Sequence, residues 1–398
     1  MPPADAAGPV GAADLDHAAT TRLRPEARAA MEPFLRDRYG NPSGSHALAR
    51  DAVRAVDEAR EQVAALLGCA PGEVVFTSGG TEADNHAVTG GLPVRPGVPV
   101  CSAVEHPAVL APVEALGGRT VAVDARGRID AAALDAVLAD LGERTSVVSV
   151  MLANNELGTV NDLAAVRGVV GDRTGAPLHT DAVQAAPWLD LRTAAAAADL
   201  VSVTAHKFGG PKGTGALVVR AGTTVRPLLR GGGQERGRRA GTTDVAGVVG
   251  LAAALAATAD GRAATNARIV ALRDRLAEGL VATVDGLTET VAPDGDRRHL
   301  LPGICHATID DVDSESLLLL LEADGVLASA ASSCASGAQQ ASHVLAALGP
   351  PRAGTGSLRL SLGWDSVAAD VDRALAAVPA AGARIRAAAG RPAAPVGG

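Results

Sequence analysis

The sequence predicts an α/β protein in which a mostly parallel central sheet is covered by helices and a smaller α+β domain follows. The first observation behind this prediction is that short apolar, strand-like segments alternate with helical patterns over residues 73–219. The second is a long alanine-rich helical stretch, from about residue 243 to about residue 281, which leads into a region with two further strand-like segments. Alternating strands and helices are typical of a parallel sheet that is covered on both faces.

The composition allows two domains and excludes several classes of protein. At 398 residues, with 47% apolar side chains, the chain can build one large core and a smaller one. Its net charge of −8 argues against a general nucleic-acid binder or a membrane-surface binder. We find neither an apolar run long enough to span a membrane nor the pattern of a signal peptide. The four cysteines are widely spaced and form no metal-ligand pattern, so we expect a cytoplasmic, reduced chain without a metal site.

The large domain is expected at residues 14–260, with its first residues packing toward the small domain. Its strands are expected at residues 73–77, 98–104, 119–123, 146–152, 177–180, 200–204 and 215–219. Its helices are expected at residues 24–38 and 47–67, from Glu82 onward, after Pro107, and at residues 163–172.

The small domain is expected at residues 261–383. Its strands are expected at residues 303–309 and 357–362, and its helices at residues 314–323, 342–348 and 367–378. Residues 1–13 and 384–398 are rich in Pro, Ala and Gly, which predicts a flexible tail at the start of the chain and a frayed tail at its end.

Polar residues repeatedly follow the predicted strands of the large domain. They occur at residues 78–81, 105–106, 154–156, 181–184 and 206–207. In such sheets ligands bind beyond the carboxyl ends of the strands. The sequence therefore predicts one composite site at that edge of the sheet.

Two lysines give the first indication of chemistry at this site. The chain has 36 Lys and Arg residues together, yet lysine occurs only at positions 207 and 212. A lysine amine can lose its proton and attack a carbonyl, which the guanidinium of arginine cannot do. We expect Lys207 or Lys212 to be a covalent catalyst; the alternative is two lysines on a solvated loop.

Other residues at the strand ends have a functional and a structural interpretation. Residues 78–82 follow a strand and open a helix, which suits a phosphate but also describes an ordinary capped turn. Asp181 could pair with a protonated ring nitrogen and Gln184 could bond a phenolic oxygen, although Asp181 could equally cap a helix. His106 could stack on a flat ring or move protons, and His206 could orient a ligand; each could also be a plain loop residue.

Three more candidates remain, of which Asn155 also follows a predicted strand. Cys334 occupies a small, polar stretch of the kind that exposes a nucleophilic thiol, whereas the other cysteines sit among apolar residues and are expected to be structural. Arg359 alternates with apolar residues on a predicted strand and could bind a substrate carboxylate, or could belong to an exposed strand face. Asn155 could place an amide over a cofactor or substrate, or could form an Asx turn.

The segments around these residues resemble the cysteine desulfurases, which are pyridoxal-phosphate (PLP) enzymes of the class V aminotransferase group with the fold-type-I architecture. The matching segments follow the family's order from residue 15 to about residue 365: LDHAATT, YGNPSGSH, FTSGGTEADN, EHPAVL, NNELGTV, HTDAVQ, TAHKFGGPKG, GGGQERGRRAGTT, SSCASG with SHVLAALG, and SLRLSLGW. The resemblance implies a fold-type-I PLP-dependent transferase.

The resemblance also implies a role for each candidate that would contact the ring of PLP. Lys207 would carry the cofactor covalently, and His106 would stack on its ring. Asp181 would pair with the pyridinium nitrogen, and Gln184 would bond the phenolic oxygen. Asn155 would lie near the cofactor.

The phosphate group of PLP would be held by a second set of residues. In one protomer these are Gly80, Thr81, Thr204 and His206. Thr242 would reach the phosphate from the partner subunit of a homodimer. Thr204 stands where the family often has Ser, which keeps the hydroxyl.

The reaction implied by the resemblance converts L-cysteine to L-alanine and leaves a persulfide on Cys334 for a sulfur-acceptor protein. Asn155 and Arg359 would hold the substrate carboxylate, and Lys212 receives no catalytic role. Ser and Ala flank Cys334 where Ala and Thr are usual, and Thr-Asp follows Thr242 where Glu-Asn is usual, which puts the contacts of these two loops in question. Iron–sulfur cluster assembly, tRNA thiolation, cofactor synthesis and DNA sulfur modification all use such enzymes.

Alternatives on the same scaffold are a selenocysteine lyase, another C–S lyase and a small-amino-acid aminotransferase. Cys334 argues against the aminotransferase, because that reaction needs no thiol. A more distant alternative is a non-catalytic scaffold protein, against which the presence of Lys207, Asp181 and Cys334 together argues.

Overall fold

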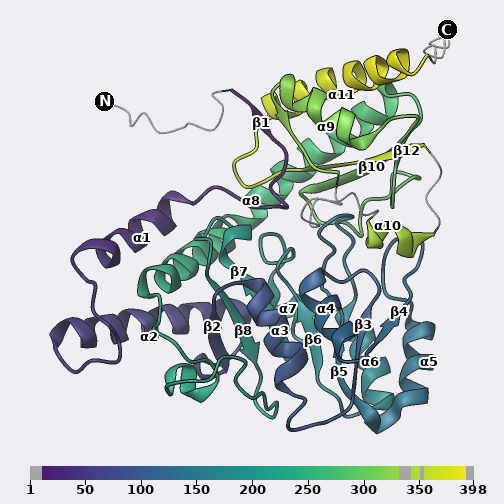
Figure 1. Cartoon of the computed structure of the whole chain (residues 1–398). Helices are drawn as coiled ribbons and strands as arrows, with labels where there is room; N and C mark the ends of the chain where they lie inside the picture. Colours follow the sequence, from purple (N-terminus) through teal and green to yellow (C-terminus); the bar gives the residue numbers. More distant parts are fainter. Residues whose placement is uncertain (1–10, 331–341, 350–353, 391–398) are drawn as a thin grey trace. The chain divides into compact units, whose positions relative to one another are not determined.

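The computed structural model describes residues 11–330, 342–349 and 354–390 (Figure 1). Contacts divide the chain into two compact units. The large unit contains residues 20–155 and 160–263, and the small unit contains the described residues of 11–19, 156–159 and 264–390. The sequence placed the boundary between residues 260 and 261, and the change of unit in the structure falls between residues 263 and 264.

The large unit is built on a seven-stranded sheet. The strands in spatial order are β2 (Val74–Thr77), β8 (Gly215–Val219), β7 (Leu200–Thr204), β6 (Leu178–Asp181), β5 (Thr145–Ser149), β3 (Val98–Ser102) and β4 (Arg119–Val121). Neighbours from β7 to β4 are parallel, whereas β8 is antiparallel to both β2 and β7. The segment between β7 and β8 is too short for a crossover helix, so β8 returns beside β7 in the opposite direction.

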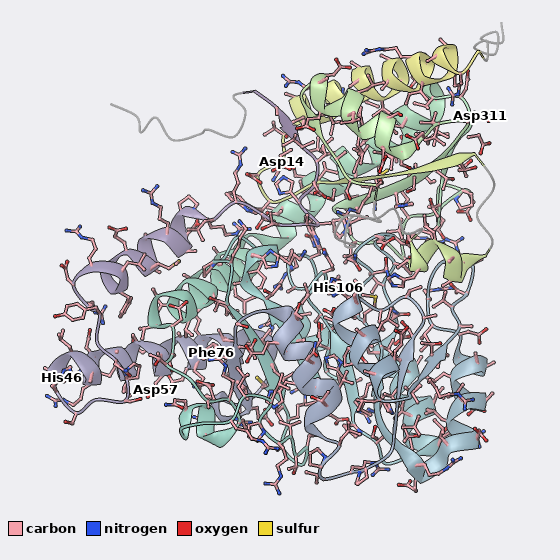
Figure 2. All side chains as sticks on the ribbon, viewed as in Figure 1. Asp14, His46, Asp57, Phe76, His106 and Asp311 are labelled. Atoms are coloured by element: carbon pink, nitrogen blue, oxygen red, sulfur yellow. The ribbon has the colours of Figure 1, made fainter. Side chains whose placement is uncertain are left out.

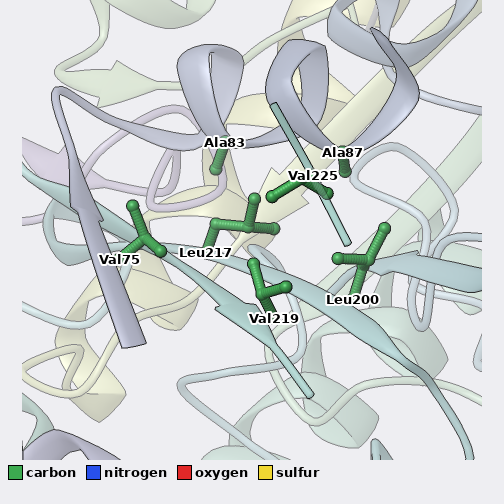
Figure 3. Packing of buried hydrophobic residues seen from close by; sticks show 7 residues of the cluster. All are labelled: Val75, Ala83, Ala87, Leu200, Leu217, Val219 and Val225. Carbon is green, nitrogen blue, oxygen red and sulfur yellow. The ribbon is translucent and has the colours of Figure 1, made fainter. Parts of the chain in front are cut away.

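Helices connect the strands of the large unit. They are α1 (Pro25–Arg36), α2 (Ala47–Leu67), α3 (Gly80–Gly90), α4 (Pro107–Ala115), α5 (Ala131–Leu141), α6 (Leu163–Arg173) and α7 (Leu191–Ala194). Figure 3 shows how α3 packs on the sheet through small residues, because Ala83 and Ala87 face apolar side chains of the strands. This buried cluster consists of Val75, Ala83, Ala87, Leu200, Leu217, Val219 and Val225. The packing fixes the first turn of α3 at the carboxyl end of β2.

The small unit contains a three-stranded antiparallel sheet with the order β12 (Thr355–Ser361), β10 (Ile304–Asp310) and β9 (Leu287–Glu289). A two-stranded parallel sheet pairs β1 (Ala13–Asp14) with β11 (Val326–Leu327). The helices of this unit are α9 (Ser314–Ala323), α10 (His343–Leu348) and α11 (Ala368–Ala388).

The helix α8 (Val245–Thr283) runs from the large unit into the small unit. By length and composition it could cross a membrane, but 56% of its most apolar window is buried inside the protein, as in the core helix of a soluble protein.

The structure agrees with most of the expected elements. The bounds of α2, β7, β8 and α9 coincide with the expected residues. The direction of β8 departs from the parallel arrangement. Five short or unforeseen elements were not expected: α5, α7, β1, β9 and β11. In addition, α11 continues to Ala388, past the predicted start of the frayed tail at Arg384, because its last turns are rich in alanine, the best helix former.

Candidate active site

Asp181 is the buried carboxylate at the carboxyl end of β6. Its side chain accepts a hydrogen bond from the backbone N–H of Val183 at 2.8 Å, and the residue is only 5% exposed. Burial raises the pKa of Asp181, while His106 and Lys207 lower it electrostatically. Both residues must therefore lie close to this carboxyl group. The structure brings together three of the predicted site residues from three different strand ends.

Lys207 lies just beyond β7, at the end of a short 3-10 helix, Ala205–Lys207. It is half-buried, whereas Lys212 is exposed on the following loop. The neighbouring His206 shares a hydrogen bond of 3.1 Å between its Nδ1 and the hydroxyl of Thr20. Burial, and next the charge of Lys207, lower the pKa of His206 to about 4, so its imidazole is neutral at neutral pH. The difference in burial thus distinguishes the two lysines and favours Lys207 as the candidate.

His106 stands at the start of α4, where its Nδ1 accepts a hydrogen bond of 3.1 Å from the backbone N–H of Ala108 (Figure 2). The preceding residue, Glu105, is fully buried. Its Oε1 accepts hydrogen bonds of 2.7 Å from the hydroxyl of Ser102 and from the backbone N–H of Met151. Glu105 thus ties the turn that carries His106 to the ends of two neighbouring strands.

The turn between β2 and α3 leaves the first turn of the helix without a side-chain cap. Gly79 is the N-cap residue and has a φ of 151°, a conformation that other residues rarely adopt. A Cβ atom on Gly80 would lie 2.9 Å from Val183 Cγ2 and 3.7 Å from Thr204 Cβ. The backbone therefore approaches β7 and the segment after β6 closely, and its N–H groups are available to an anion.

The remaining site residues of the large unit differ in exposure. Gln184 is buried, Asn155 is half-buried, and Thr242 is exposed. The loop that carries Thr242 is held by Arg239, which forms an ion pair of 2.9 Å with Glu82 in the first turn of α3.

Arg359 lies on β12 of the small unit, paired in the sheet with His306. It is only 6% exposed, and its guanidinium donates a hydrogen bond of 2.7 Å to the carboxylate of Asp16. The alternative of an exposed strand face is therefore wrong. A guanidinium that is buried and fixed by an ion pair is of the kind that can bind a substrate carboxylate.

Cys334 lies outside the described residues. The nearest described residue after it, Ser342, donates a hydrogen bond of 2.5 Å from its hydroxyl to Glu156 Oε2. Both residues are buried, and burial raises the pKa of Glu156. Ser342 thus fixes the point where the chain enters α10.

A cavity borders the candidate site. A cavity of about 660 Å³ lies between α3 and α4, and its lining includes Thr81, Asn85 and His106. Within the described residues, no group of three or more His, Cys, Asp and Glu side chains is arranged to hold a metal ion.

Sequence reasoning singled out neither Asp84 nor His179, two buried titratable residues near Asp181, which are 1% and 0% exposed. Glu105, which is fully buried, lay in the polar segment at residues 105–106 but received no role of its own. A usable signal was present for His179, because a residue two positions before Asp181 on the same strand faces the same side of the sheet. Asp84 carried a signal as well, since it lies between Ala83 and Ala87, which mark the buried face of α3.

Comparison with known proteins agrees with this architecture. The family model described as aminotransferase class-V matches residues 14–374, and the chain belongs to that family. The chain is 45% identical over 389 residues to a protein of Mycobacterium tuberculosis named IscS-like cysteine desulfurase, with 94% of this chain and 97% of the relative covered. A protein of Gluconacetobacter diazotrophicus named cysteine desulfurase is 42% identical over 382 residues, with 94% of each covered.

A solved structure titled NifS-like protein has the same fold. It superimposes with a TM-score of 0.84 at 31% identity and covers 93% of this chain and 99% of its own. Together these matches confirm the family and the fold that the sequence predicted.

Proposed function

We infer that this protein is a PLP-dependent cysteine desulfurase, which converts L-cysteine to L-alanine and leaves a persulfide on Cys334. The observation that carries the proposal is the convergence of Asp181, Lys207 and His106 at the carboxyl edge of the sheet. The names of the two curated relatives support the same activity.

The residues present fit PLP, the cofactor that this family and fold imply. The uncapped first turn of α3, with Gly80 against Val183, forms a cradle for a phosphate group. A buried carboxylate such as Asp181 suits a protonated ring nitrogen, because an opposite charge stabilises its ionised form. A half-buried Lys207 beside it suits covalent attachment of an aldehyde.

Each residue would hold one part of the cofactor. Gly80, Thr81, Thr204 and His206 would bind the phosphate, and Asp181 would bind the ring nitrogen. The hydroxyl of Thr204 donates to the backbone carbonyl of Thr214 at 3.2 Å, so it would have to leave this acceptor to donate its one proton to the phosphate. Gln184 would bond the phenolic oxygen, and His106, held at the start of α4, would cover one face of the ring.

The chemistry proceeds through two nucleophiles. Bound PLP supplies an electron sink for the electrons of the substrate Cα–H bond. The Nζ of Lys207 would hold the cofactor and, once the substrate amine has displaced it, would accept the Cα proton. The thiolate of Cys334 would then attack the sulfur of the substrate: an S–S bond forms, and the C–S bond breaks with its electron pair on Cβ. Cβ takes up the proton that the Cys334 thiol had released, and return of the Cα proton from Lys207 yields L-alanine.

Partners follow from the same proposal. Asn155 and Arg359 would hold the carboxylate of L-cysteine. Thr242, exposed in the single protomer, would complete the phosphate site of the other subunit in a homodimer. A sulfur-acceptor protein, for example in iron–sulfur cluster assembly in the cytoplasm, would receive the persulfide sulfur from Cys334.

Two variants of the purified protein test the proposal. Lys207→Ala should lose the visible absorbance of the covalently bound cofactor, because only Lys207 provides the amine. Cys334→Ala should keep that absorbance but form neither L-alanine at the wild-type rate nor a protein persulfide. Undiminished alanine production by Cys334→Ala would show that the nucleophile has been assigned wrongly, and a keto acid product would point to an aminotransferase.

A further inference from the structure

A row of buried polar side chains crosses three strands of the large sheet beside Asp181. His179 on β6 is fully buried, and its Nδ1 lies 2.8 Å from the hydroxyl of Ser149 on β5. Its Nε2 lies 3.0 Å from the hydroxyl of Ser202 on β7. The strand register places Ser149 opposite His179 and Ser202 opposite Asp181. Since His179 and Asp181 are two residues apart on one strand, both face the same side of the sheet.

Asp84 meets this row from the helix that covers it. The side chain comes from α3 and is 2% exposed, and its Oδ1 lies 3.6 Å from the Nε2 of His179. In the part of the chain that the structure describes, this Oδ1 is buried and accepts no hydrogen bond. An ionised carboxylate in such a place would leave one oxygen desolvated and uncompensated.

The groups around Asp84 do not stabilise a negative charge. Burial lowers the pKa of His179 to about 3, so its imidazole is neutral and gives Asp84 no positive partner. The titratable groups that face Asp84 are His179 and Asp181 from β6 and Glu105 from the turn after β3. Burial first, and then the charges of Asp181 and Glu105, raise the pKa of Asp84 well above its ordinary value, while a hydrogen bond with Ser202 opposes them.

We propose that Asp84 is a positioning residue that stays protonated beside Asp181, so that the negative charge of this buried cluster rests on Asp181 alone. Two neighbouring carboxyl groups in a dry site do not both ionise. His106 and Lys207 act on Asp181 and favour its ionised form, which leaves the proton on Asp84. The neutral His179, bonded to serines on both sides, holds the row rigid between the two acids.

The consequence for catalysis rests on the proposed function. Asp181 must remain ionised to keep a proton on the ring nitrogen of PLP. A second negative charge on Asp84 would raise the pKa of Asp181 and divide the charge between two carboxyl groups. Asp84 acts through Asp181 and contacts neither the substrate nor the cofactor in this proposal.

The first test uses the apoprotein, so it is independent of the proposed function. Asp84→Asn keeps the shape of a protonated acid but cannot ionise. In the unfolded chain Asp84 releases its proton above its ordinary pKa of 3.8, whereas in the folded protein it retains the proton. The stability that Asp84 contributes is therefore fully present below that pKa and is lost as the pH rises toward its folded pKa. The unfolding equilibrium constant of the wild type, divided by that of Asp84→Asn, should rise by about tenfold per pH unit above pH ~4.5.

A matched variant separates charge from packing. Asp84→Ala also cannot ionise, but it leaves a cavity on α3. Its unfolding equilibrium constant should show the same dependence on pH relative to the wild type, offset by a factor that does not change with pH. A ratio that is independent of pH, or that falls with rising pH, would overturn the proposal. Failure of Asp84→Asn to fold would also overturn it, because an amide replaces a neutral acid without a change of shape.

The second test uses the holoenzyme and reads out Asp181. The visible absorbance of the bound cofactor should titrate with the same apparent pKa in the wild type and in Asp84→Asn. If Asp84 were ionised, its replacement would remove a negative charge near the cofactor and lower that apparent pKa. A lowered value would therefore contradict the proposal, even if the variant stayed active.

Discussion

The loop that carries Thr242 is anchored by a buried ion pair whose removal should be costly. Glu235 forms a bidentate pair with Arg60 of α2, with distances of 2.7 and 2.9 Å. The two side chains are only 6% and 7% exposed. The Oε2 atom of Glu235 also accepts the backbone N–H of Phe76, labelled in Figure 2, at 3.0 Å, and the guanidinium lies over the ring of Phe76 at 4.6 Å.

Glu235→Gln is the sharpest perturbation of this anchor. The amide oxygen can still accept from Phe76, so the main loss is the counter-ion of Arg60. Breaking a buried ion pair by removal of one partner costs about 3–5 kcal/mol. The turn adds strain of its own, because Glu235 and Arg236 have φ values of 49° and 55°, which cost non-glycine residues about 1 kcal/mol or more each. The pair offsets this strain in the native state.

Urea unfolding followed by circular dichroism measures the loss. An exposed pair on α1, Arg36 with Glu32, provides the control, because its side chains are 68% and 55% exposed. Glu32→Gln should cost less than about 0.5 kcal/mol. The double variant Arg60→Met with Glu235→Gln should recover most of the loss, since no buried charge remains without a partner. A loss below about 1 kcal/mol for Glu235→Gln, or a double variant less stable than both single ones, would refute this reasoning.

Two further predictions concern the candidate site. A Cβ atom on Gly215 would lie 2.8 Å from the Cα of Gly79 and 2.7 Å from the carbonyl oxygen of Val203, both backbone atoms. Gly215→Ala should therefore shift the turn between β2 and α3 and weaken binding of PLP to the apoprotein by about 1–3 kcal/mol, which corresponds to roughly 5- to 150-fold. Gly72→Ala, where a Cβ would meet nothing within 4 Å, is the control, and equal affinities in a PLP titration would disprove the steric argument. Burial raises the pKa of Glu105 from its ordinary value of 4.5 to about 8. The folded protein therefore holds a proton on Glu105 that the unfolded chain releases, and the stability gained from this proton is lost as the pH rises from 4.5 to about 8. In thermal unfolding, the stability of Glu105→Gln relative to the wild type should therefore increase as the pH rises over that range. If this difference increased as the pH fell instead, the conclusion that Glu105 is protonated in the folded protein would be wrong.

The fold could be predicted largely from local patterns. The periodicity of residues 47–67 gave the bounds of α2, and the apolar run at residues 200–204 gave β7. The direction of β8 could not be read in this way, because an isolated strand has the same pattern whether its neighbour is parallel or antiparallel. The short connection from Ala205 to Thr214 leaves no room for a crossover helix, which favours an antiparallel pair. It settles the direction of β8 only when β7 and β8 are known to be neighbours in the sheet.

The candidate site was predicted in part. Polar residues at strand ends stand out against apolar strands, and this pattern made Asp181, His106 and Lys207 candidates. Asp84 was not found, because a carboxylate in a helix is most often solvated, and its burial depends on strands that lie far along the chain. His179 lies 95 residues after Asp84, yet the two side chains are 3.6 Å apart.

The sequence by itself determined that strands and helices alternate and which family the motifs resemble, and it predicted that one of two lysines is a covalent catalyst. Each of these conclusions depends on residue types and on spacing along the chain. The tertiary structure decided which lysine lies beside Asp181, since Lys207 is half-buried and Lys212 is exposed. It also decided that Arg359 is buried. Finally, it placed the buried carboxyl groups of Asp84, Asp181 and Glu105 close enough that the charges of Asp181 and Glu105 raise the pKa of Asp84. Burial and electrostatic coupling depend on segments that meet only in the folded chain, and for that reason local patterns do not contain them.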